Sequence, residues 1–253
     1  MTHTLLAVLA LTALLIACAA PPRASLHGPL LLERSVTVNN QAHKFAIWVP
    51  AAYDPRTPCP CVVFLHGSGE CGTDGLKQTT VGLLSAAKAD PAQWPCIIVM
   101  PQKPTPQREW EDYDDMVMAC LRAAERELAI DQRRVSLTGL SQGGHGAWVL
   151  GARHRDVFSH LAPICGYVHT RRGGVTLDPS DASTLAPFKG KPIWAFHGEK
   201  DDVVPPSESK DMIAALRALH ITPEPRLTLY PDANHNSWDN AYRKENLGAW
   251  LTR

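Results

Sequence analysis

The clearest indication of the fold is the sequence Thr138-Gly139-Leu140-Ser141-Gln142-Gly143-Gly144. It follows an apolar run at 135–138 and opens a helical pattern over 142–154, which places the serine at a sharp strand-to-helix turn. Glycines suit both sides of such a turn, because it leaves no space for side chains. The serine hydroxyl then projects above the sheet, beside the positive helix end and the free N–H of Gln142. We predict that Ser141 is a nucleophile.

Strand-like and helix-like patterns alternate on both sides of this turn. Asn39-Asn40 is a turn signal between runs 35–38 and 44–49, which predicts an antiparallel hairpin. Continuous apolar runs, typical of strands buried on both faces, occupy 61–65, 96–100, 135–138, 160–164 and 193–196, and a last strand is expected at 226–230. Helical spacing occurs at 112–129, 142–154, 207–220 and 238–252. The alternation predicts an α/β fold with a mostly parallel central sheet and helices on both faces.

Two further segments carry chemistry. Leu65-His66-Gly67-Ser68-Gly69-Glu70 follows an apolar strand, and such a loop can direct a backbone N–H at the oxygen of a tetrahedral intermediate, together with the Gln142 N–H. We interpret His66 as a structural brace rather than a base. Asp201 and Asp202 come just past a strand end, and His235 lies in a loop after the last strand. A serine followed by an acid and then a histidine is the chain order of the α/β-hydrolase arrangement.

These motifs resemble those of α/β-hydrolase fold serine esterases, in the carboxylesterase/phospholipase-like branch and the related prolyl-oligopeptidase-like esterases. The resemblance covers about residues 32–253. It implies that Ser141, Asp201 and His235 form a catalytic triad, with Asp201 rather than the adjacent Asp202 as the acid. It also implies that the N–H of Ser68 completes an oxyanion hole with that of Gln142. The reaction would be ester hydrolysis through an acyl-serine.

Composition and the remaining motifs exclude other classes of protein. The 25 basic residues balance the 25 acidic ones, which argues against a nucleic-acid partner. Scattered histidines and the lack of a dinucleotide-type glycine pattern predict neither a metal nor a cofactor. Trp110 and Trp238 are candidates for lining the substrate mouth, although packing roles are equally compatible with aromatic residues. We interpret His145 and His169 as surface or helix-top residues.

The segment 165–192 stands at the usual place of a cap domain and is short. We therefore expect an open cleft, suited to short acyl chains or to acetyl and feruloyl esters exposed on polysaccharide. Two alternatives remain open at this point. One is a serine peptidase of the same fold, which usually carries an N-terminal propeller for which residues 19–31 leave no room. The other is a non-catalytic binding lipoprotein.

The N-terminus predicts export. Residues 5–20 form an apolar run too short to span a bilayer and of signal-peptide length. Its end, Leu15-Ile16-Ala17-Cys18, resembles a bacterial lipoprotein lipobox, which implies that Cys18 becomes an acylated N-terminus. Residues 1–4 lack the usual basic residue, so a plain signal peptide is the alternative. We predict a signal peptide over 1–18, a tether over 19–31, one hydrolase domain over 32–253 and a location in the periplasm or cell envelope.

Six cysteines remain beyond Cys18, an even number that is compatible with disulfides in an oxidising compartment. Cys59 and Cys61 open one predicted strand and Cys96 opens another. If these strands are neighbours, Cys96 could pair with Cys59 or Cys61. Free buried thiols are an equally supported alternative, because cysteine packs as a small hydrophobic residue.

Overall fold

The computed structural model describes residues 29–170 and 173–253, and the Cys18 prediction lies outside them. Eight strands form one sheet in the order β1-β2-β4-β3-β5-β6-β7-β8. The strands are β1 (Leu30–Val38), β2 (Gln41–Val49), β3 (Cys59–Leu65), β4 (Ile97–Pro101), β5 (Ile130–Leu140), β6 (Leu161–Ile164), β7 (Trp194–Gly198) and β8 (Arg226–Tyr230). Strand β2 pairs antiparallel with both of its neighbours, β1 and β4. All the other neighbouring pairs, from β4-β3 to β7-β8, are parallel. The predicted fold class is confirmed.

The hairpin of β1 and β2 closes where the sequence predicted it. Asn39 and Asn40 have φ values of 49° and 61°, and Val38 pairs with Gln41 across them. Two left-handed residues match the twist of a two-residue hairpin, and asparagine tolerates this conformation well. Strand β1 begins at Leu30, so the end of the predicted tether is part of the sheet. Leu30 packs against the hydrophobic core as a partly buried residue.

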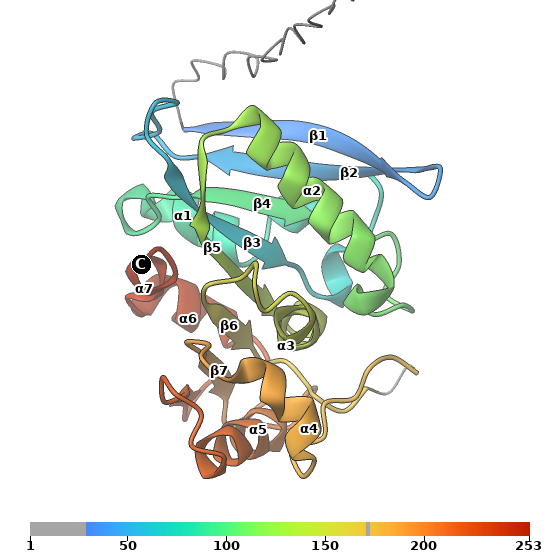
Figure 1. The fold of residues 1–253 in the computed structure, drawn as a ribbon, viewed down its shortest axis with the longest axis vertical. Coiled ribbons are helices and arrows are strands. Elements are labelled where there is room, and N and C mark those ends of the chain that lie inside the picture. Colours follow the sequence, from blue (N-terminus) through green and yellow to red (C-terminus); the bar gives the residue numbers. More distant parts are fainter. Residues whose placement is uncertain (1–28, 171–172) are drawn as a thin grey trace, which may run out of the picture.

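Helices cover both faces of the sheet. Helices α2 (Asp114–Glu127), α3 (Gln142–Arg153) and α5 (Ser207–Ala218) pack on one face, and α1 (Leu83–Ala89), α6 (Trp238–Lys244) and α7 (Leu247–Leu251) on the other; α4 (Ala182–Leu185) precedes β7. Figure 1 shows α2 and α3 in front of the sheet. A hydrophobic core lies on each face of the sheet, and alternate residues of β3 point into one or the other. Val63 packs in the core on the α2 side, and Val62 and Phe64 pack in the core on the α1 side.

The sequence prediction differs from the structure at several element boundaries. The expected helix 238–252 is two helices, because Glu245 has extended backbone angles that end α6. Helix α1 was not predicted. Cys61 pairs with Ile97 across neighbouring parallel strands, yet Cys59, Cys61 and Cys96 are all free thiols. Of the two cysteine alternatives, the structure therefore has the free thiols, buried at Cys61 and Cys96 and half-buried at Cys59.

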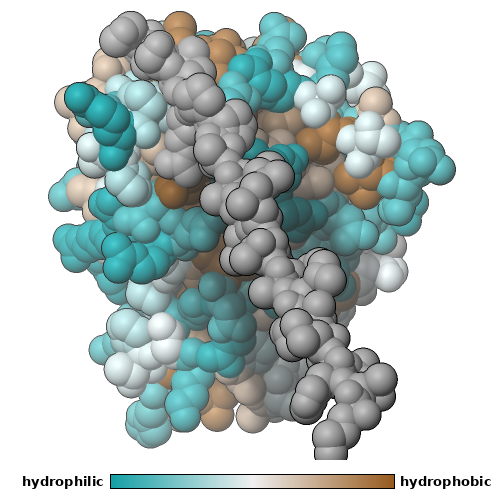
Figure 2. Space-filling view, turned by 45° about the horizontal axis from the view of Figure 1, so that its top comes forward, coloured by the Kyte–Doolittle hydropathy of each residue, from teal (hydrophilic) through white to brown (hydrophobic). Residues whose placement is uncertain are grey.

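The face shown in Figure 2 is largely hydrophilic, with hydrophobic residues in separate small patches. Among the large hydrophobic residues described, Leu76, Val203 and Leu219 are exposed. No helix within 29–170 and 173–253 is long and apolar enough to cross a membrane.

Candidate active site

Ser141 occupies a strained turn between β5 and α3. Its φ of 55° lies in the left-handed region, which is uncommon for a residue with a side chain. The turn is also tightly enclosed, since a methyl group at Gly143 would overlap the carbonyl oxygen of Leu65, and one at Gly139 would overlap that of Gly143. The backbone N–H of Ser141 donates to Ile164 O at 2.9 Å and ties the turn to β6. Strain of this kind persists where the surrounding structure holds it, often at functional sites.

The structure brings three predicted residues into one hydrogen-bonded chain. Ser141 Oγ lies 2.9 Å from His235 Nε2, and His235 Nδ1 lies 2.8 Å from Asp201 Oδ2. The serine follows β5, the aspartate follows β7 and the histidine follows β8, so the three meet at the carboxyl edge of the parallel strands. Ligands and reacting groups gather at this edge in open α/β sheets.

Asp201 is held as an anion by its surroundings. Its Oδ1 accepts the backbone N–H groups of Val203 at 3.0 Å and Val204 at 2.9 Å. Burial raises the pKa of this carboxyl, but hydrogen bonds from His197 and His235 and the two N–H groups outweigh it and leave the pKa well below its ordinary value. The adjacent Asp202 is exposed and makes none of these contacts.

His197 contacts the carboxylate of Asp201, a role that the sequence analysis did not predict. Its ring is fully buried, with Nδ1 2.8 Å from Ser209 Oγ and Nε2 3.0 Å from Val204 O. The same Nε2 lies 3.2 Å from Asp201 Oδ2. The only sequence signal was its place in the His-Gly-x-x-Asp segment.

His66 braces the loop that carries Ser68, in agreement with its predicted structural role. Its Nδ1–H donates to Gly67 O at 2.6 Å, and Nε2 accepts the Lys103 N–H at 3.1 Å. Burial lowers the pKa of His66 to about 3, so the ring stays neutral and keeps one tautomer. Ser68 opens a short 3₁₀ helix (Ser68–Glu70) and Gln142 opens α3. At these first positions the backbone N–H groups have no partner within the helix.

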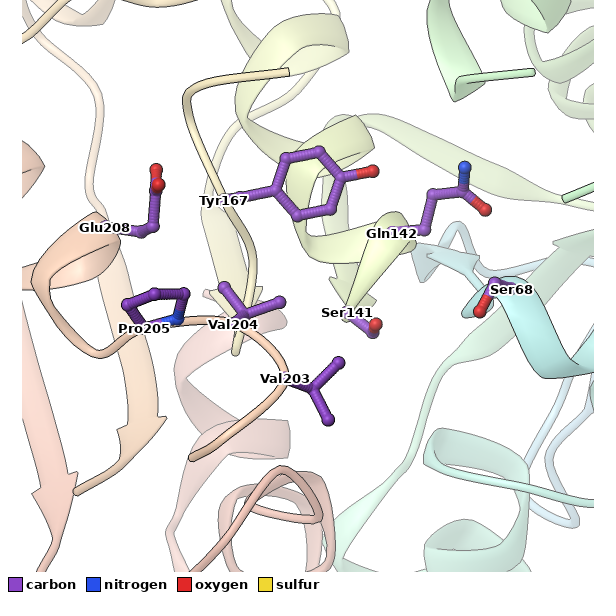
Figure 3. A pocket seen from close by; sticks show the side chains of 8 residues that line it. All are labelled: Ser68, Ser141, Gln142, Tyr167, Val203, Val204, Pro205 and Glu208. Atoms are coloured by element: carbon purple, nitrogen blue, oxygen red, sulfur yellow. The ribbon is translucent and has the colours of Figure 1, made fainter. Parts of the chain in front are cut away.

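A cavity of about 290 Å³ opens beside the serine (Figure 3). Ser68 and Glu208 lie on opposite sides of Ser141 in this view, and the ring of Tyr167 lies above. The volume is at the small end of ligand pockets, which run from about 300 to 1,000 Å³. The lining residues are Ser68, Ser141, Gln142, Tyr167, Val203, Val204, Pro205 and Glu208.

With this geometry established, comparison with known proteins identifies the family. The family model described as "Putative esterase" matches residues 35–234. The chain belongs to this esterase family. The match includes Ser141 and Asp201 and stops one residue before His235.

The esterase also resembles solved structures of the α/β-hydrolase fold. A thermostable esterase is 28% identical, with a TM-score of 0.71 over 87% of this chain and 62% of that one. A ferulic acid esterase from Anaeromyces mucronatus is 18% identical, with a TM-score of 0.66 over 92% of this chain and 97% of that one. The uncharacterized peptidase YuxL of Bacillus subtilis (strain 168) is 27% identical over 50% of this chain, which spans 22% of that peptidase.

The two tryptophans proposed to line the substrate mouth are placed differently. Trp110 of the esterase is fully buried and does not line the cavity; its indole N–H donates to His66 O at 3.1 Å. It therefore packs beneath the His66 loop, in the packing role that the sequence had left open beside a place at the substrate mouth. Trp238 is partly buried, and its ring stands edge-on to His235 with centroids 5.6 Å apart. It contacts the histidine rather than the cavity.

Two other histidines differ in burial. His145 was expected at the surface or at the top of a helix, but it is fully buried and stacks on Tyr167 with centroids 4.5 Å apart. His169 is exposed and lies 3.1 Å from Glu208 through Nδ1. Tyr167, in the loop after β6, and Glu208, in the first turn of α5, were not predicted as site residues, because only the tertiary fold brings them to Ser141.

Within the described residues, one group of donor atoms is close enough to suggest a metal site. The side chains of Cys165, Asp201 and His235 place one donor atom each within 4.8 Å of one another. The donor set suits a metal poorly: burial raises the pKa of the Cys165 thiol to about 12, and metals bind the thiolate. The other two side chains are already hydrogen-bonded to each other.

Proposed function

We propose that this esterase hydrolyses carboxylic esters through an acyl-serine formed at Ser141. The observation that carries the proposal is the continuous hydrogen-bonded chain from Ser141 through His235 to Asp201. A free serine hydroxyl is a weak nucleophile, and a histidine within hydrogen-bond reach activates it. Asp201 would fix the imidazole with its proton on Nδ1, which leaves Nε2 to accept the serine proton.

The reaction would proceed in two halves. Ser141 Oγ attacks the ester carbonyl while its proton passes to His235 Nε2, and the oxyanion that forms is bound by the N–H groups of Ser68 and Gln142. The imidazolium then gives its proton to the departing alcohol. Water loses a proton to His235 as it attacks the acyl carbon, and the imidazolium then returns a proton to Ser141 Oγ as the bond to the serine breaks and the acid leaves. Each oxyanion-hole donor typically contributes about 3–4 kcal/mol to stabilising the transition state.

We propose small acyl groups, or acetyl and feruloyl groups exposed on polysaccharide, as the substrate class. The cavity of about 290 Å³ has room for a short acyl chain or one aromatic ring, and it opens directly at Ser141. The segment between β6 and β7 contributes only the four-residue helix α4 and a short 3₁₀ turn within its described part. The similar fold of a ferulic acid esterase is consistent with this class.

A serine peptidase is the second candidate, because half of the chain matches a protein named as a peptidase. Both reactions use the same three residues. Hydrolysis of an aminoacyl 4-nitroanilide faster than of 4-nitrophenyl acetate would favour the peptidase.

Hydrolysis of 4-nitrophenyl acetate by purified protein tests the esterase proposal. The Ser141→Ala variant should lose at least about 10³-fold in kcat/KM, and Ser180→Ala, which removes an exposed serine far along the chain, should retain it. Equal rates for wild type and Ser141→Ala would reject the proposed nucleophile.

We further propose that the protein is exported and anchored through lipid on Cys18, as the lipobox-like sequence implies. Membrane contact would then depend on Cys18 alone. Expression of the full chain in a bacterium, followed by membrane fractionation, tests this. A Cys18→Ser protein that still fractionates with membranes would refute the lipid anchor.

A further inference from the structure

The cavity beside Ser141 has a carboxylate at one end. Glu208 belongs to the first turn of α5, lines the cavity and has a side chain that is 14% exposed. In Figure 3, Ser68 lies on one side of Ser141, and Glu208 and Pro205 lie on the other. A group that extends from Ser141 along the cavity therefore approaches Glu208.

The acyl part of an ester is the part that fits this cavity. The carbonyl oxygen must face the N–H groups of Ser68 and Gln142, and the alcohol oxygen must lie beside His235, which protonates it. Ser68 and Gln142 line the cavity, whereas His235 is not among the described residues that do. The acyl group is left to occupy the space that leads to Glu208.

The walls between the two ends favour a flat acyl group. Tyr167 lines one side, and Val204 and Pro205 line another (Figure 3). The Tyr167 ring is held in place, since His145 stacks on it with an interplanar angle of 12° and its hydroxyl donates to Glu109 at 2.8 Å. An aryl group packs well between an aromatic ring and aliphatic side chains.

Glu208 keeps one oxygen available to a ligand. Oε2 accepts the backbone N–H of Val168 at 2.8 Å and that of His169 at 3.2 Å, and His169 Nδ1 lies 3.1 Å away. Among the described residues no hydrogen bond reaches Oε1. The bonds to Oε2 fix the carboxylate, and Oε1 is left as an acceptor for a single donor at the end of the cavity.

We infer that Glu208 is a specificity-determining residue that selects aryl acyl groups with a hydroxyl at the end distant from the ester. The inference rests on the proposed ester hydrolysis at Ser141 and names the acyl group for that site. A phenolic O–H donates to Oε1, whereas an ether oxygen at the same position places two acceptors against each other. A hydrogen bond to a charged acceptor is strong enough to discriminate between such substrates.

The test compares methyl esters of 4-hydroxycinnamate, 4-methoxycinnamate and cinnamate, with 4-nitrophenyl acetate as a substrate too short to reach Glu208. The wild type should favour the 4-hydroxy ester over the 4-methoxy ester by about tenfold or more in kcat/KM. In Glu208→Gln, the amide oxygen can still accept the Val168 N–H, so that the amide nitrogen replaces Oε1. The ratio of kcat/KM for the 4-hydroxy ester to that for the 4-methoxy ester should fall to about one or reverse, because the amide nitrogen at this end of the cavity donates a hydrogen bond instead of accepting one.

A matched control is Asp211→Asn, which removes one carboxylate from an exposed position of the same helix. It should keep the wild-type ratio. A general disturbance of the fold by Glu208→Gln would slow all the cinnamates alike and leave the ratio unchanged.

The two proposals fail in different ways. Absence of hydrolysis of 4-nitrophenyl acetate by the wild type would reject the proposed function. Hydrolysis of the acetate with equal rates for the 4-hydroxy and 4-methoxy esters, or a hydroxyl preference that persists in Glu208→Gln, would overturn only the role of Glu208.

Discussion

Replacing Asp201 with asparagine changes the position of the proton on His235. His197 Nε2, which lies 3.2 Å from Oδ2, keeps its hydrogen bond to Val204 O at 3.0 Å. Asparagine retains one oxygen that can accept the N–H groups of Val203 and Val204, which now bond to Oδ1 at 3.0 and 2.9 Å. Its amide nitrogen then stands where Oδ2 faces His235 Nδ1 at 2.8 Å. An amide donor there selects the tautomer protonated on Nε2, which cannot accept the proton of Ser141.

The expected magnitude follows from losing the base. In serine hydrolases the wrong tautomer lowers kcat by about 10⁴-fold, equivalent to about 5.5 kcal/mol in the activation barrier. We therefore expect Asp201→Asn to lose about 10³–10⁴-fold in kcat on 4-nitrophenyl acetate, with a small change in KM. The substrate does not contact Asp201, so ground-state binding should be preserved.

Asp202→Asn provides the matched control. It removes one carboxylate from the next position in the chain, which is exposed. It should change kcat less than threefold. Thermal unfolding of both variants separates a folding defect from a chemical one. A folded Asp201→Asn that retains more than a tenth of wild-type kcat, or an Asp202→Asn with the larger loss, would refute this assignment of the acid.

Three further predictions concern the surrounding structure. Gly143→Ala should destabilise the fold by about 3 kcal/mol or more in denaturant unfolding, because the added methyl meets the backbone of Leu65, whereas Gly69→Ala meets nothing within 4 Å and should cost less than about 1 kcal/mol. The buried His66 has a pKa of about 3, so below about pH 6.5 this histidine gains a proton in the unfolded chain but not in the folded protein. The free energy of unfolding should therefore fall by up to about 1.4 kcal/mol per pH unit toward pH 5. His66→Gln should flatten this slope. Ser68→Pro removes the backbone N–H at a helix position where proline is tolerated, and should lose about 10²–10³-fold in kcat, at least tenfold more than Ser68→Ala.

Local sequence patterns predicted the parts of the fold that depend on local chemistry. Asn39-Asn40 closes the first hairpin, and the glycines around Ser141 form the strand-to-helix turn, because in both places few residue types can adopt the required backbone. Helix α1 was missed because it has only seven residues and too few turns to show a period. The break at Glu245 carried no glycine or proline signal.

The site residues likewise fall into those that a local motif predicted and those that only the tertiary fold brings together. Ser141, Asp201 and His235 each followed a recognisable strand, and the structure brings them into hydrogen-bond contact. Tyr167 and Glu208 belong to segments with no motif, and they meet only because β6 and β7 are neighbours in the sheet. Both roles stayed open for Trp110, because an aromatic residue gives no local sign of the direction it faces; here the ring is buried under the His66 loop.

The central claim is that Ser141 is the residue that becomes acylated. Incubation of the protein with a fluorophosphonate, followed by digestion and mass spectrometry, tests it most directly. We predict one stoichiometric adduct on the peptide that contains Ser141, no adduct in Ser141→Ala, and greatly slowed labelling in a folded Asp201→Asn. A stoichiometric adduct on another residue, or labelling that persists in Ser141→Ala, would contradict it.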